Sequence, residues 1–353
     1  MAAASTQRLL AHRSGFQRAL HAWYRVHRRR LPWREAPSLY RTVVSEFMLQ
    51  QTQVRTALPY FQRWLHELPD FAALAAASEA RVLKLWEGLG YYSRARHLHR
   101  LAQVLAGRAA PPPTPEAWRS LPGVGPYTAA AITSLAFGAP AACVDGNVVR
   151  VLARLAADRT EFRDGAMAAR HFAPLAAALL QRDDPGTHNQ AMMELGATIC
   201  GRRHPRCPSC PVRRWCAAAQ RGDPEAFPRL APKKVAPHKM LRVWCERGGR
   251  LLLYRAAPGA RRLAALHELP TPAELGLDIS AVEASPLLAR RQRSFTNRRL
   301  TESIHAVSLT GPQHRRLASR PALRWVPRAH LDRIALSGPH RRWIAELLAA
   351  RDC

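Results

Sequence analysis

The sequence of 353 residues predicts a mainly α-helical region followed by a small α+β domain. Three observations lead to this prediction. Over most of residues 5–220, apolar residues recur at spacings of three and four, as on the buried faces of helices. Four prolines then punctuate residues 224–237, which is typical of a tether. Beyond the tether, short β-type runs and a closing apolar helix indicate a second domain.

These changes in composition set the predicted boundaries. We expect a helical domain over residues 1–220, a linker over residues 221–238 and a C-terminal domain over residues 239–353. A chain of this length is long enough for two ordinary domains. In the C-terminal domain, the runs 240–245 and 250–254 are joined at two glycines, which is a hairpin signal.

The charge of the chain favours a polyanionic partner. Its net charge is +29, from 54 basic and 25 acidic residues, and such an excess is typical of proteins that bind nucleic acid. Almost all of the basic residues are arginines, so a compositional origin stays open. No apolar stretch is long enough to span a membrane, and the N-terminus lacks the apolar block of a secretory signal. We expect no membrane contact and a cytoplasmic location.

Four cysteines lie close together in the sequence. Cys200, Cys207, Cys210 and Cys216 have the spacing C-x6-C-x2-C-x5-C. Four thiolates at this density can surround a zinc ion or a 4Fe–4S cluster, and four unrelated core cysteines would be improbable. Zinc ribbons usually have two C-x2-C pairs and only one is present, so the spacing leans toward iron–sulfur but leaves both metals open.

A glycine-containing turn and an aspartate follow one another upstream of the cysteines. The segment L-P-G-V-G at residues 121–125 precedes Pro126, a residue that suits the first position of a helix. Gly123 and Gly125 allow a tight turn whose amides can face a phosphate. Asp145 stands about twenty residues later at the head of an apolar helix, where the simplest role is an N-cap.

In this order, the hairpin, the aspartate and the cysteine loop resemble the helix–hairpin–helix DNA glycosylase superfamily. Within it, endonuclease III and the MutY-type adenine DNA glycosylases are the two similar lines. Residues 45–54, S-E-F-M-L-Q-Q-T-Q-V, are very similar to the MutY signature. Residues 31–34, 88–96 and 189–197 also resemble motifs of this family, and the resemblance covers roughly residues 20–220.

One position separates the two lines. In endonuclease III a lysine just after the hairpin forms a Schiff base with the sugar, whereas Tyr127 stands at that position here. The four lysines of the chain, Lys84, Lys233, Lys234 and Lys239, all lie elsewhere in the sequence. The resemblance therefore implies a monofunctional adenine glycosylase without strand cleavage.

The resemblance assigns the chemistry to two carboxylates. Glu46 is the candidate general acid toward adenine N7, and we expect burial to raise its pKa. Asp145 is expected to stay ionised beneath the sugar and either to stabilise an oxocarbenium-like cation or to attack it transiently. Tyr127 and Asn147 would hold the sugar and the catalytic water. These two carboxylates, 99 residues apart in the sequence, must converge in space.

The resemblance also implies residues that enter the DNA helix. Gln51 and Tyr91 match family positions that wedge into the gap left by a flipped base. Gly123 and Gly125 would present their amides to a phosphate.

Further positions are expected to bind the substrate. Arg29, Trp33, Arg34 and Glu194 are expected walls of the adenine pocket, although Arg29 is one of three consecutive arginines that would also suit a solvated patch. Gln190 belongs to the same expected set.

The C-terminal domain resembles the Nudix-type domain of MutY enzymes. It lacks the clustered glutamates of Nudix hydrolases, so we expect no Mg²⁺ site. In the family this domain inspects the base opposite the adenine, usually 8-oxoguanine. Phe295 and Thr296 are the expected contacts, because they lie where the family has Phe-Ser. Asn297 and His267 depart from the family's usual residues.

The resemblance also implies a cofactor and a substrate. We expect a structural 4Fe–4S cluster on the four cysteines, double-stranded DNA with A:8-oxoG or A:G mispairs as substrate, and a monomeric bacterial protein associated with the nucleoid. Two other functions stay open at this point. One is an endonuclease III-like pyrimidine glycosylase with lyase activity, and the other is a non-catalytic iron–sulfur DNA-binding module.

Overall fold

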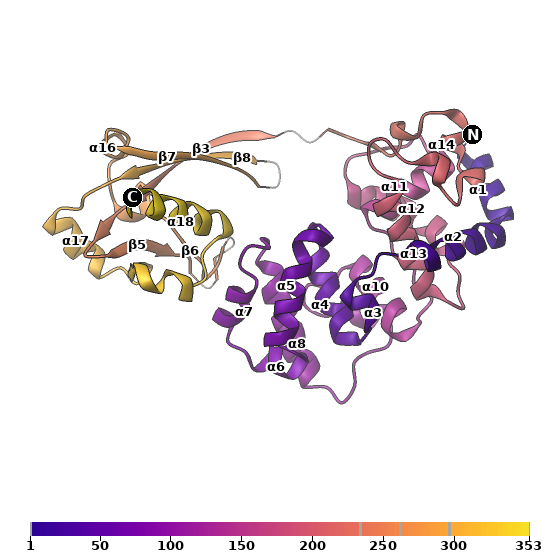
Figure 1. Ribbon diagram of the computed structural model, residues 1–353, viewed down its shortest axis with the longest axis horizontal. Helices are drawn as coiled ribbons and strands as arrows, with labels where there is room; N and C mark the ends of the chain where they lie inside the picture. Colours follow the sequence, from indigo (N-terminus) through magenta and orange to yellow (C-terminus); the bar gives the residue numbers. More distant parts are fainter. Residues whose placement is uncertain (1, 233–234, 258, 261–262, 296–297, 353) are drawn as a thin grey trace. The chain divides into compact units, whose positions relative to one another are not determined.

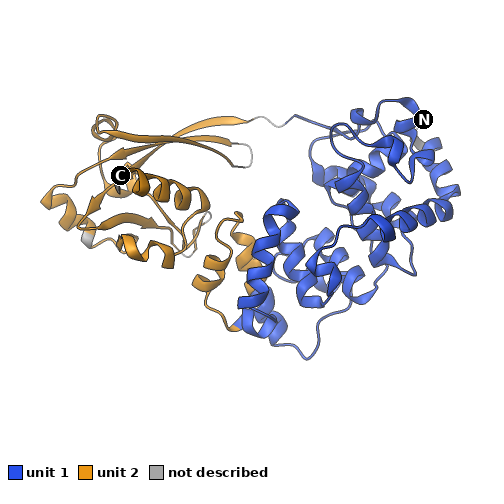
Figure 2. Cartoon of the chain, in the orientation of Figure 1, with its two compact units in different colours: residues 1–75, 100–232 blue, residues 76–99, 233–353 orange. Residues whose placement is uncertain are grey.

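The chain forms two compact units (Figure 2). One unit consists of residues 1–75 and 100–232, and the other of residues 76–99 and 233–353. The segment 76–99 therefore packs with the C-terminal part of the chain, a grouping that the sequence analysis did not anticipate. The computed structural model describes residues 2–232, 235–257, 259–260, 263–295 and 298–352.

The first unit is almost entirely helical, as the apolar spacing predicts (Figure 1). Two short strands, β1 (Glu161–Phe162) and β2 (Arg229–Leu230), pair in parallel. None of the described helices is long and apolar enough to cross a membrane. The helices of this unit are α1 (Ala2–Ala11), α2 (Arg13–His27), α3 (Pro32–Glu35), α4 (Leu39–Leu49), α5 (Val54–Glu67), α6 (Phe71–Ala76), α9 (Pro115–Arg119), α10 (Pro126–Phe137), α11 (Gly146–Ala156), α12 (Gly165–Leu179), α13 (Pro185–Thr198) and α14 (Ala217–Arg221).

Short polar side chains begin many of these helices. Ser38, Thr114, Asp145, Asp164 and Asp184 each accept a hydrogen bond from a backbone N–H in the first turn of α4, α9, α11, α12 and α13. Such caps satisfy N–H groups that have no partner within the helix. Asp145 therefore does cap a helix, as the simplest interpretation of the sequence holds.

The predicted hairpin joins α9 to α10. Gly123 has a φ of +74°, a left-handed conformation in which glycine carries no steric penalty. Gly125 is the N-cap of α10 and has extended backbone angles, so its conformation does not require glycine. The helix–hairpin–helix element is therefore present, and one of its two glycines is dictated by the turn.

Four helices in contact bring distant segments of the first unit together. Helix α10 packs against α4 and α13, and α11 packs against α13. The core of α11 includes Leu152, which lies among Phe16, Phe172 and Leu195. This packing places the end of α4, the start of α10, the start of α11 and the middle of α13 around one space.

The contact between α13 and α11 depends on a glycine. A Cβ atom at Gly196 would lie 2.6 Å from the Cβ of Asn147 and 3.1 Å from its carbonyl oxygen. Both obstacles belong to the start of α11 and not to the end of a flexible side chain. Gly196 thus allows α13 to approach the turn that carries Asn147.

The second unit is the predicted α+β part (Figure 1). In one sheet β8 (Arg298–Ala306) lies between β3 (Ala236–Trp244), to which it is parallel, and β7 (Leu287–Phe295). In the other sheet β5 (Arg250–Arg255) pairs with β4 (Glu246–Arg247), β6 (His267–Glu268) and β9 (Leu323–Pro327). The predicted hairpin between residues 240–245 and 250–254 was wrong, because β3 pairs with β8 and the turn at the two glycines joins β5 to the short strand β4. The helices of this unit are α7 (Glu79–Leu85), α15 (Pro272–Leu275), α16 (Ile279–Glu283), α17 (Gly311–Ala318), α18 (Gly338–Asp352) and the first part of α8 (Ser93–Ala106).

Two apolar layers hold the sheets of this unit. Trp343 and Leu347 of α18 pack with Leu251 of β5 and Ile304 of β8. A separate cluster joins the strands to α15, α16 and α17. The hairpin between β7 and β8 contains Thr296 and Asn297, which lie outside the described residues, as does the side chain of Phe295.

Replacing Gly196 by alanine tests the close approach of α13. Because the new methyl group must displace the backbone of α11, we expect Gly196→Ala to lower the free energy of unfolding by about 1–3 kcal/mol. The measurement is urea denaturation. Gly165→Ala is the matched control, since a Cβ there meets no atom within 4 Å, and its effect should stay within about 0.5 kcal/mol. Equal effects of the two variants would contradict the packing argument.

Candidate active site

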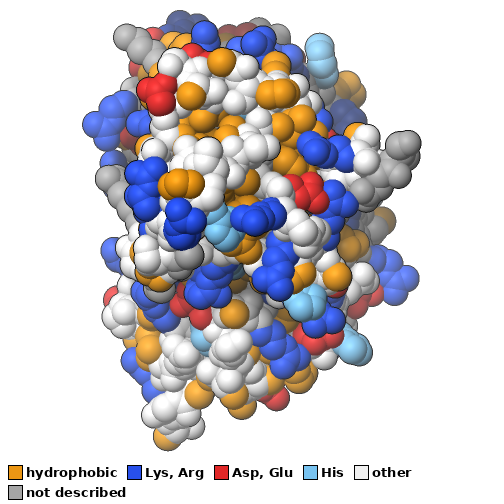
Figure 3. Space-filling view, turned by 90° about the vertical axis from the view of Figure 1, so that its left-hand side faces the viewer, with side chains coloured by type: hydrophobic (Ala, Val, Ile, Leu, Met, Phe, Trp, Pro, Cys, Tyr) orange, Lys and Arg blue, Asp and Glu red, His pale blue; other side chains and the backbone are white. Residues whose placement is uncertain are grey.

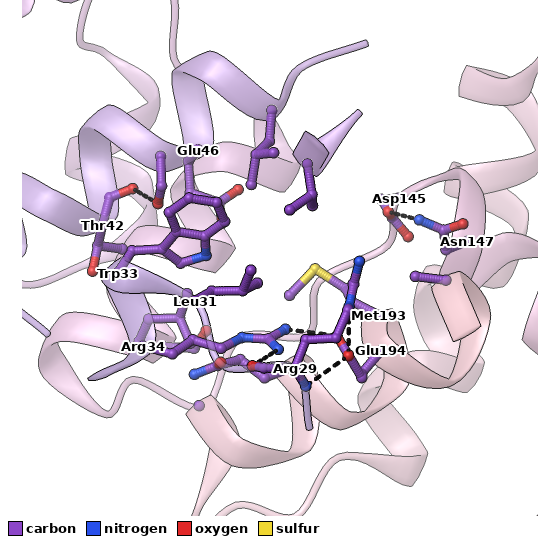
Figure 4. A pocket seen from close by; sticks show the side chains of 18 of the residues that line it. Arg29, Leu31, Trp33, Arg34, Thr42, Glu46, Asp145, Asn147, Met193 and Glu194 are labelled. Atoms are coloured by element: carbon purple, nitrogen blue, oxygen red, sulfur yellow. Dashed lines mark hydrogen bonds and ion pairs between the residues drawn. The ribbon is translucent and has the colours of Figure 1, made fainter. Parts of the chain in front are cut away.

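A cavity of about 1440 Å³ opens in the first unit at the junction of α4, α10, α11 and α13. Most of the residues that the sequence analysis singled out line it, and Figure 4 shows Glu46 and Asp145 on facing walls with Met193 between them. The predicted residues that line the cavity are Glu46, Asp145, Tyr127, Asn147, Arg29, Trp33, Arg34, Gln51, Gln190 and Glu194.

The other predicted site residues lie elsewhere. Gly123 and Gly125 are in the hairpin and do not line the cavity. Tyr91 belongs to the second unit, and its side chain is exposed. Thr296 and the side chain of Phe295 are outside the described residues, so their predicted DNA contacts stay predictions.

Glu46 is buried on the inward face of α4 and is only 7% exposed. Burial raises the pKa of Glu46 from 4.5 to about 7, and the nearby charge of Asp145 acts in the same direction. A hydrogen bond from Tyr127 and the charge of Arg34 oppose this rise. Because removal from water disfavours a charged carboxylate, Glu46 retains a proton near neutral pH.

Asp145 stands at the start of α11 in a different environment. One carboxylate oxygen accepts the N–H of Val148 at 2.7 Å, and the other accepts Nδ2 of Asn147 at 2.9 Å. The pKa of Asp145 is raised above its ordinary value, because burial outweighs the two hydrogen bonds and the charge of Arg150, which lower it. Donors directed at both oxygens favour the ionised form.

Asn147 is itself held by Arg150, a residue that the sequence analysis missed. Nη2 of Arg150 donates to Oδ1 of Asn147 at 2.8 Å and to the carbonyl oxygen of Gly196 at 2.8 Å, and Nε donates to the carbonyl oxygen of Cys200 at 2.7 Å. Because the amide oxygen faces Arg150, the amide nitrogen faces Asp145. The sequence feature that could have identified Arg150 is the presence of an arginine within a mostly apolar helix.

Tyr127 connects the two walls of the cavity. Its hydroxyl hydrogen-bonds to Glu46 and lies 3.1 Å from Sδ of Met193. Burial and the surrounding acidic groups raise the pKa of Tyr127 well above its ordinary value. The phenol is therefore neutral and acts as a donor. Met193 was not among the predicted site residues, although it lies inside the motif that supplies Glu194.

An ion-pair cluster around the buried Glu194 lines the cavity (Figure 4). Glu194, whose side chain is fully buried, accepts Nε and Nη2 of Arg29 at 2.7 and 2.9 Å and Nη2 of Arg34 at 3.0 Å. Although burial acts to raise the pKa of Glu194, these arginines hold it below its ordinary value. Arg29 is thus a bidentate partner of Glu194, and the alternative of a solvated patch was wrong for this residue.

Two further cavity residues have distinct roles. Trp33 packs its edge against Phe61, with ring centroids 5.0 Å apart, and forms an apolar wall. Gln51 has a φ of +56°, which is strained for a residue with a side chain, and it is exposed at the rim. Strain of this kind is concentrated at functional positions.

The four cysteines lie on one loop around two short 3-10 turns, η1 (Cys207–Ser209) and η2 (Arg213–Trp215). Burial, and to a smaller extent the three neighbouring thiols, raise the pKa of Cys210 to about 12. In the described part of the chain, no three His, Cys, Asp or Glu side chains are placed to hold a metal ion.

Arg154 of α11 borders this loop. It is 1% exposed, and Nη1 lies 3.2 Å from Sγ of Cys200 and 2.7 Å from the carbonyl oxygen of Gly201. Among the described residues, no carboxylate forms an ion pair with Arg154. Arg154 also donates to the carbonyl oxygens of Phe227 and Arg202, and thiolates at this loop would add the negative charge that stabilises a buried cation. The donor set therefore fits an anionic thiolate-bound group.

Comparisons with known proteins agree with this fold and cavity. Residues 44–173 match the HhH-GPD superfamily base excision DNA repair protein family. The chain is 44% identical over 224 residues to the adenine DNA glycosylase of Rattus norvegicus, covering 59% of this chain and 42% of that protein. It is 41% identical over 208 residues to the adenine DNA glycosylase of Mycobacterium tuberculosis, covering 58% of this chain and 68% of that protein.

One solved structure extends the comparison. A thermostable thymine-DNA glycosylase superposes with a TM-score of 0.53 at 26% identity, over 60% of this chain and 98% of its own. Fold and cavity thus define a protein of the helix–hairpin–helix base-excision repair superfamily. Within this superfamily, the chain belongs to the MutY-type adenine DNA glycosylase family. It matches less than half of the length of the Rattus norvegicus relative.

The raised pKa of Glu46 predicts how stability varies with pH. Between pH 4.5 and about 7 the folded protein binds more protons at Glu46 than the unfolded chain does, so this residue makes stability fall as pH rises. Glu46→Gln removes the titration. As pH rises through this window, the free energy of unfolding of the variant should therefore increase relative to that of the wild type, by up to about 3 kcal/mol.

Urea denaturation at several pH values measures this difference. Glu116→Gln, at an exposed position of α9, is the control and should leave the pH dependence unchanged. A constant difference between Glu46→Gln and the wild type at all pH values would contradict the assignment of a neutral Glu46.

Proposed function

We propose that this chain is a monofunctional adenine DNA glycosylase that hydrolyses the N-glycosidic bond of adenine mispaired with 8-oxoguanine or guanine in duplex DNA. The observation that carries the proposal is the pair of carboxylates on one cavity. Glu46 is buried with a raised pKa, and Asp145 accepts two N–H donors. Burial raises the pKa of both groups, but at Asp145 the two N–H donors and the charge of Arg150 oppose the rise, and such different surroundings suit two carboxylates to different tasks.

Glu46 supplies the proton for the leaving group. Adenine leaves poorly as an anion, so protonation of the base lowers the barrier to cleavage. A pKa of about 7 keeps a useful fraction of Glu46 protonated at neutral pH while leaving the acid strong enough to donate. Tyr127, which donates to the same carboxyl group, orients it toward the base.

Asp145 stabilises the sugar. As the glycosidic bond breaks, positive charge develops on the ring, and an ionised carboxylate fixed by Val148 and Asn147 requires no reorganisation to face it. The hydrogen bond from Arg150 holds the Asn147 amide in the orientation that serves Asp145. Water then adds to the sugar cation and gives up a proton to the Glu46 carboxylate, which lost its own proton to the base, and an abasic site remains.

The absence of an amine nucleophile supports hydrolysis without strand cleavage. None of the described residues lining the cavity is a lysine, and Tyr127 occupies the hairpin position of the endonuclease III lysine. Lys84 lies in the second unit, where its Nζ contacts Glu87 at 2.6 Å. A bifunctional pyrimidine glycosylase, which requires a Schiff base, is therefore less well supported.

The cavity suits an extruded base. Adenine must leave the helix before the carboxylates reach it, at a cost of a few kcal/mol of unstacking. The Arg29–Glu194–Arg34 cluster and Trp33 form polar and apolar walls for the base. Gln51, strained at the rim, is placed to fill the gap that the base leaves.

Charge supports duplex DNA as the partner. The net charge of +29 favours a polyanion, and on the face drawn in Figure 3 Lys and Arg side chains far outnumber Asp and Glu. A non-catalytic DNA-binding module would share this charge but has no use for two carboxylates on a cavity. The catalytic proposal is therefore the better supported, with the chain acting as a monomer.

The second unit is proposed to read the base opposite the adenine as a Nudix-like domain. The supporting feature is the hairpin between β7 and β8, where Phe295 pairs with Arg298 across residues 296 and 297. Phe295 and Thr296 are the proposed contacts to 8-oxoguanine.

The cysteine loop is proposed to hold a 4Fe–4S cluster on Cys200, Cys207, Cys210 and Cys216. A bound cluster would fix the loop in a structural role. The support is the set of four neighbouring thiols beside the buried, carboxylate-free Arg154. Arg150 and Arg154 connect this loop to α11, the helix that begins at Asp145.

The excision assay tests the proposed activity. Duplexes with adenine opposite 8-oxoguanine, guanine or thymine are incubated under single-turnover conditions and analysed with and without alkali. We expect strand breaks only after alkali, and only opposite 8-oxoguanine and guanine, because hydrolysis leaves an intact abasic strand. Breaks without alkali would indicate a lyase, and no release would favour a binding module.

Asp145→Asn tests the role of the second carboxylate. Asparagine also caps helices, so the fold should survive, while the loss of charge should lower the excision rate by about 100-fold or more. Asp164→Asn is the matched control, because Asp164 caps α12 in the same way and does not line the cavity. Unchanged excision by Asp145→Asn would contradict the mechanism.

Cys210→Ser tests the cofactor. Iron and acid-labile sulfide in the purified wild type should be present in equal amounts and should fall strongly in the variant, because one of the four thiolates is lost. Cys245→Ala, which alters a buried cysteine of the second unit, should leave both contents unchanged. Zinc in place of iron, or iron equal in the two variants, would contradict the proposal.

A further inference from the structure

A strained loop of the second unit presents Tyr91. The loop joins α7 to α8, and Tyr91 has a φ of +46° with 42% of the residue exposed. Gly88 and Gly90, with φ values of +106° and +72°, precede it. An exposed aromatic ring on a left-handed residue is costly, and such strain persists only where surrounding contacts impose it.

Part of the restraint comes from the loop's own neighbours. Nη2 of Arg94 donates to the carbonyl oxygens of Leu89 and Gly90 at 3.1 and 3.0 Å, and Nε1 of Trp86 donates to that of Gly90 at 3.0 Å. The guanidinium of Arg94 also lies over the ring of Tyr91, 5.5 Å from its centroid. These contacts shape the turn but do not fix it to the rest of the unit.

Further restraint comes from the C-terminal part of the chain. Glu87 accepts the N–H of Leu336 at 3.0 Å and Nε and Nη2 of Arg341 at 2.8 and 3.2 Å. The hydroxyl of Tyr92 donates to the carbonyl oxygen of Leu336 at 3.0 Å. We call Glu87, Tyr92, Leu336 and Arg341 the Glu87 clamp. Because Glu87 precedes Tyr91 and Tyr92 follows it, the clamp holds the loop on both sides of Tyr91.

The clamp is continuous with the sheet of the same unit. Arg341 donates to the carbonyl oxygens of Leu331 and Ile334 at 2.6 and 2.7 Å, which fixes the segment ahead of α18. Leu336 also forms a β-bridge with His267 of β6. Figure 2 shows residues 76–99 in the same unit as this segment. The Glu87 side chain is 9% exposed, so its pairing with Arg341 is partly shielded from water.

We propose that Glu87 and Arg341 are positioning residues that hold the Tyr91 ring ready to stack in duplex DNA beside the extruded adenine. This inference rests on the proposed function. In a free loop, Tyr91 would relax from its left-handed conformation and would have to be ordered again on each encounter with DNA. Because the Glu87 clamp orders Tyr91 when the protein folds, no free energy is needed to order the ring on binding DNA. The full stacking free energy of the ring is then available for base extrusion.

Base extrusion is the direct readout. A duplex carries 2-aminopurine next to the mispaired adenine, and its fluorescence on binding reports unstacking. The proteins carry Asp145→Asn so that the DNA stays intact. Stacking of a base on one aromatic ring changes an equilibrium constant by about 5- to 100-fold. Tyr91→Ala should therefore lower the equilibrium constant for base extrusion by about that factor. We expect Glu87→Gln and Arg341→Gln to lower it by about 5-fold or more.

Two comparisons separate positioning from a general structural role. In the Tyr91→Ala background, Glu87→Gln should have almost no further effect, because it acts only through that ring. Arg342→Gln and Glu283→Gln are matched controls at exposed positions of α18 and α16 and should leave extrusion unchanged. Circular dichroism verifies that each variant is folded.

The outcomes are distinct from those of the proposed function. Normal extrusion by Glu87→Gln and Arg341→Gln, or effects that add to that of Tyr91→Ala, would overturn the inference while adenine excision by the wild type stands. If the wild type extrudes the base but excises no adenine, the proposed function is contradicted, whereas the role of the Glu87 clamp remains supported. Failure of the wild type to unstack the duplex at all would overturn the inference.

Discussion

The removal of Glu46 from water is the interaction on which the account of this cavity depends. A carboxyl group at 7% exposure is costly when charged, and this cost is what moves its pKa to about 7. The burial exists because α10 packs against both α4 and α13, and Gly196 lets α13 approach the start of α11 closely. The packing of the helical core therefore sets the proton affinity of Glu46. A change that admits water beside α4 would weaken both.

At the second carboxylate, hydrogen bonds oppose burial, which is the larger influence and raises the pKa of Asp145. Asp145 caps α11 and takes a further donor from Asn147, whose orientation is fixed by Arg150. Arg150 also binds the backbone of Gly196 and Cys200. The position of the ionised group is thus determined by α13 and by the start of the cysteine loop. Two acids of similar intrinsic strength are separated in function by these different surroundings.

Much of this arrangement is predictable from the sequence, because it depends on local patterns. Helical spacing indicates α4 and α10, and the hairpin glycines and an aspartate at a helix start predict the turn and Asp145. Long-range contacts are different. Three arginines in a row do not reveal that Arg29 alone pairs with Glu194, 165 residues away. No local pattern predicts the contact between Glu87 and Arg341, which lie 254 residues apart. For this reason the grouping of residues 76–99 with the C-terminal part was not anticipated.

The protonation of Glu46 in the working protein is the central claim, and the pH dependence of single-turnover adenine release tests it most directly. If Glu46 donates its proton, the rate constant should be level from the pH at which Asp145 is ionised up to about 7 and should fall tenfold per pH unit above it, and Glu46→Gln should abolish this upper limb together with most of the rate. A rate that is independent of pH across neutrality, or a Glu46→Gln variant that keeps the wild-type profile, would contradict the account.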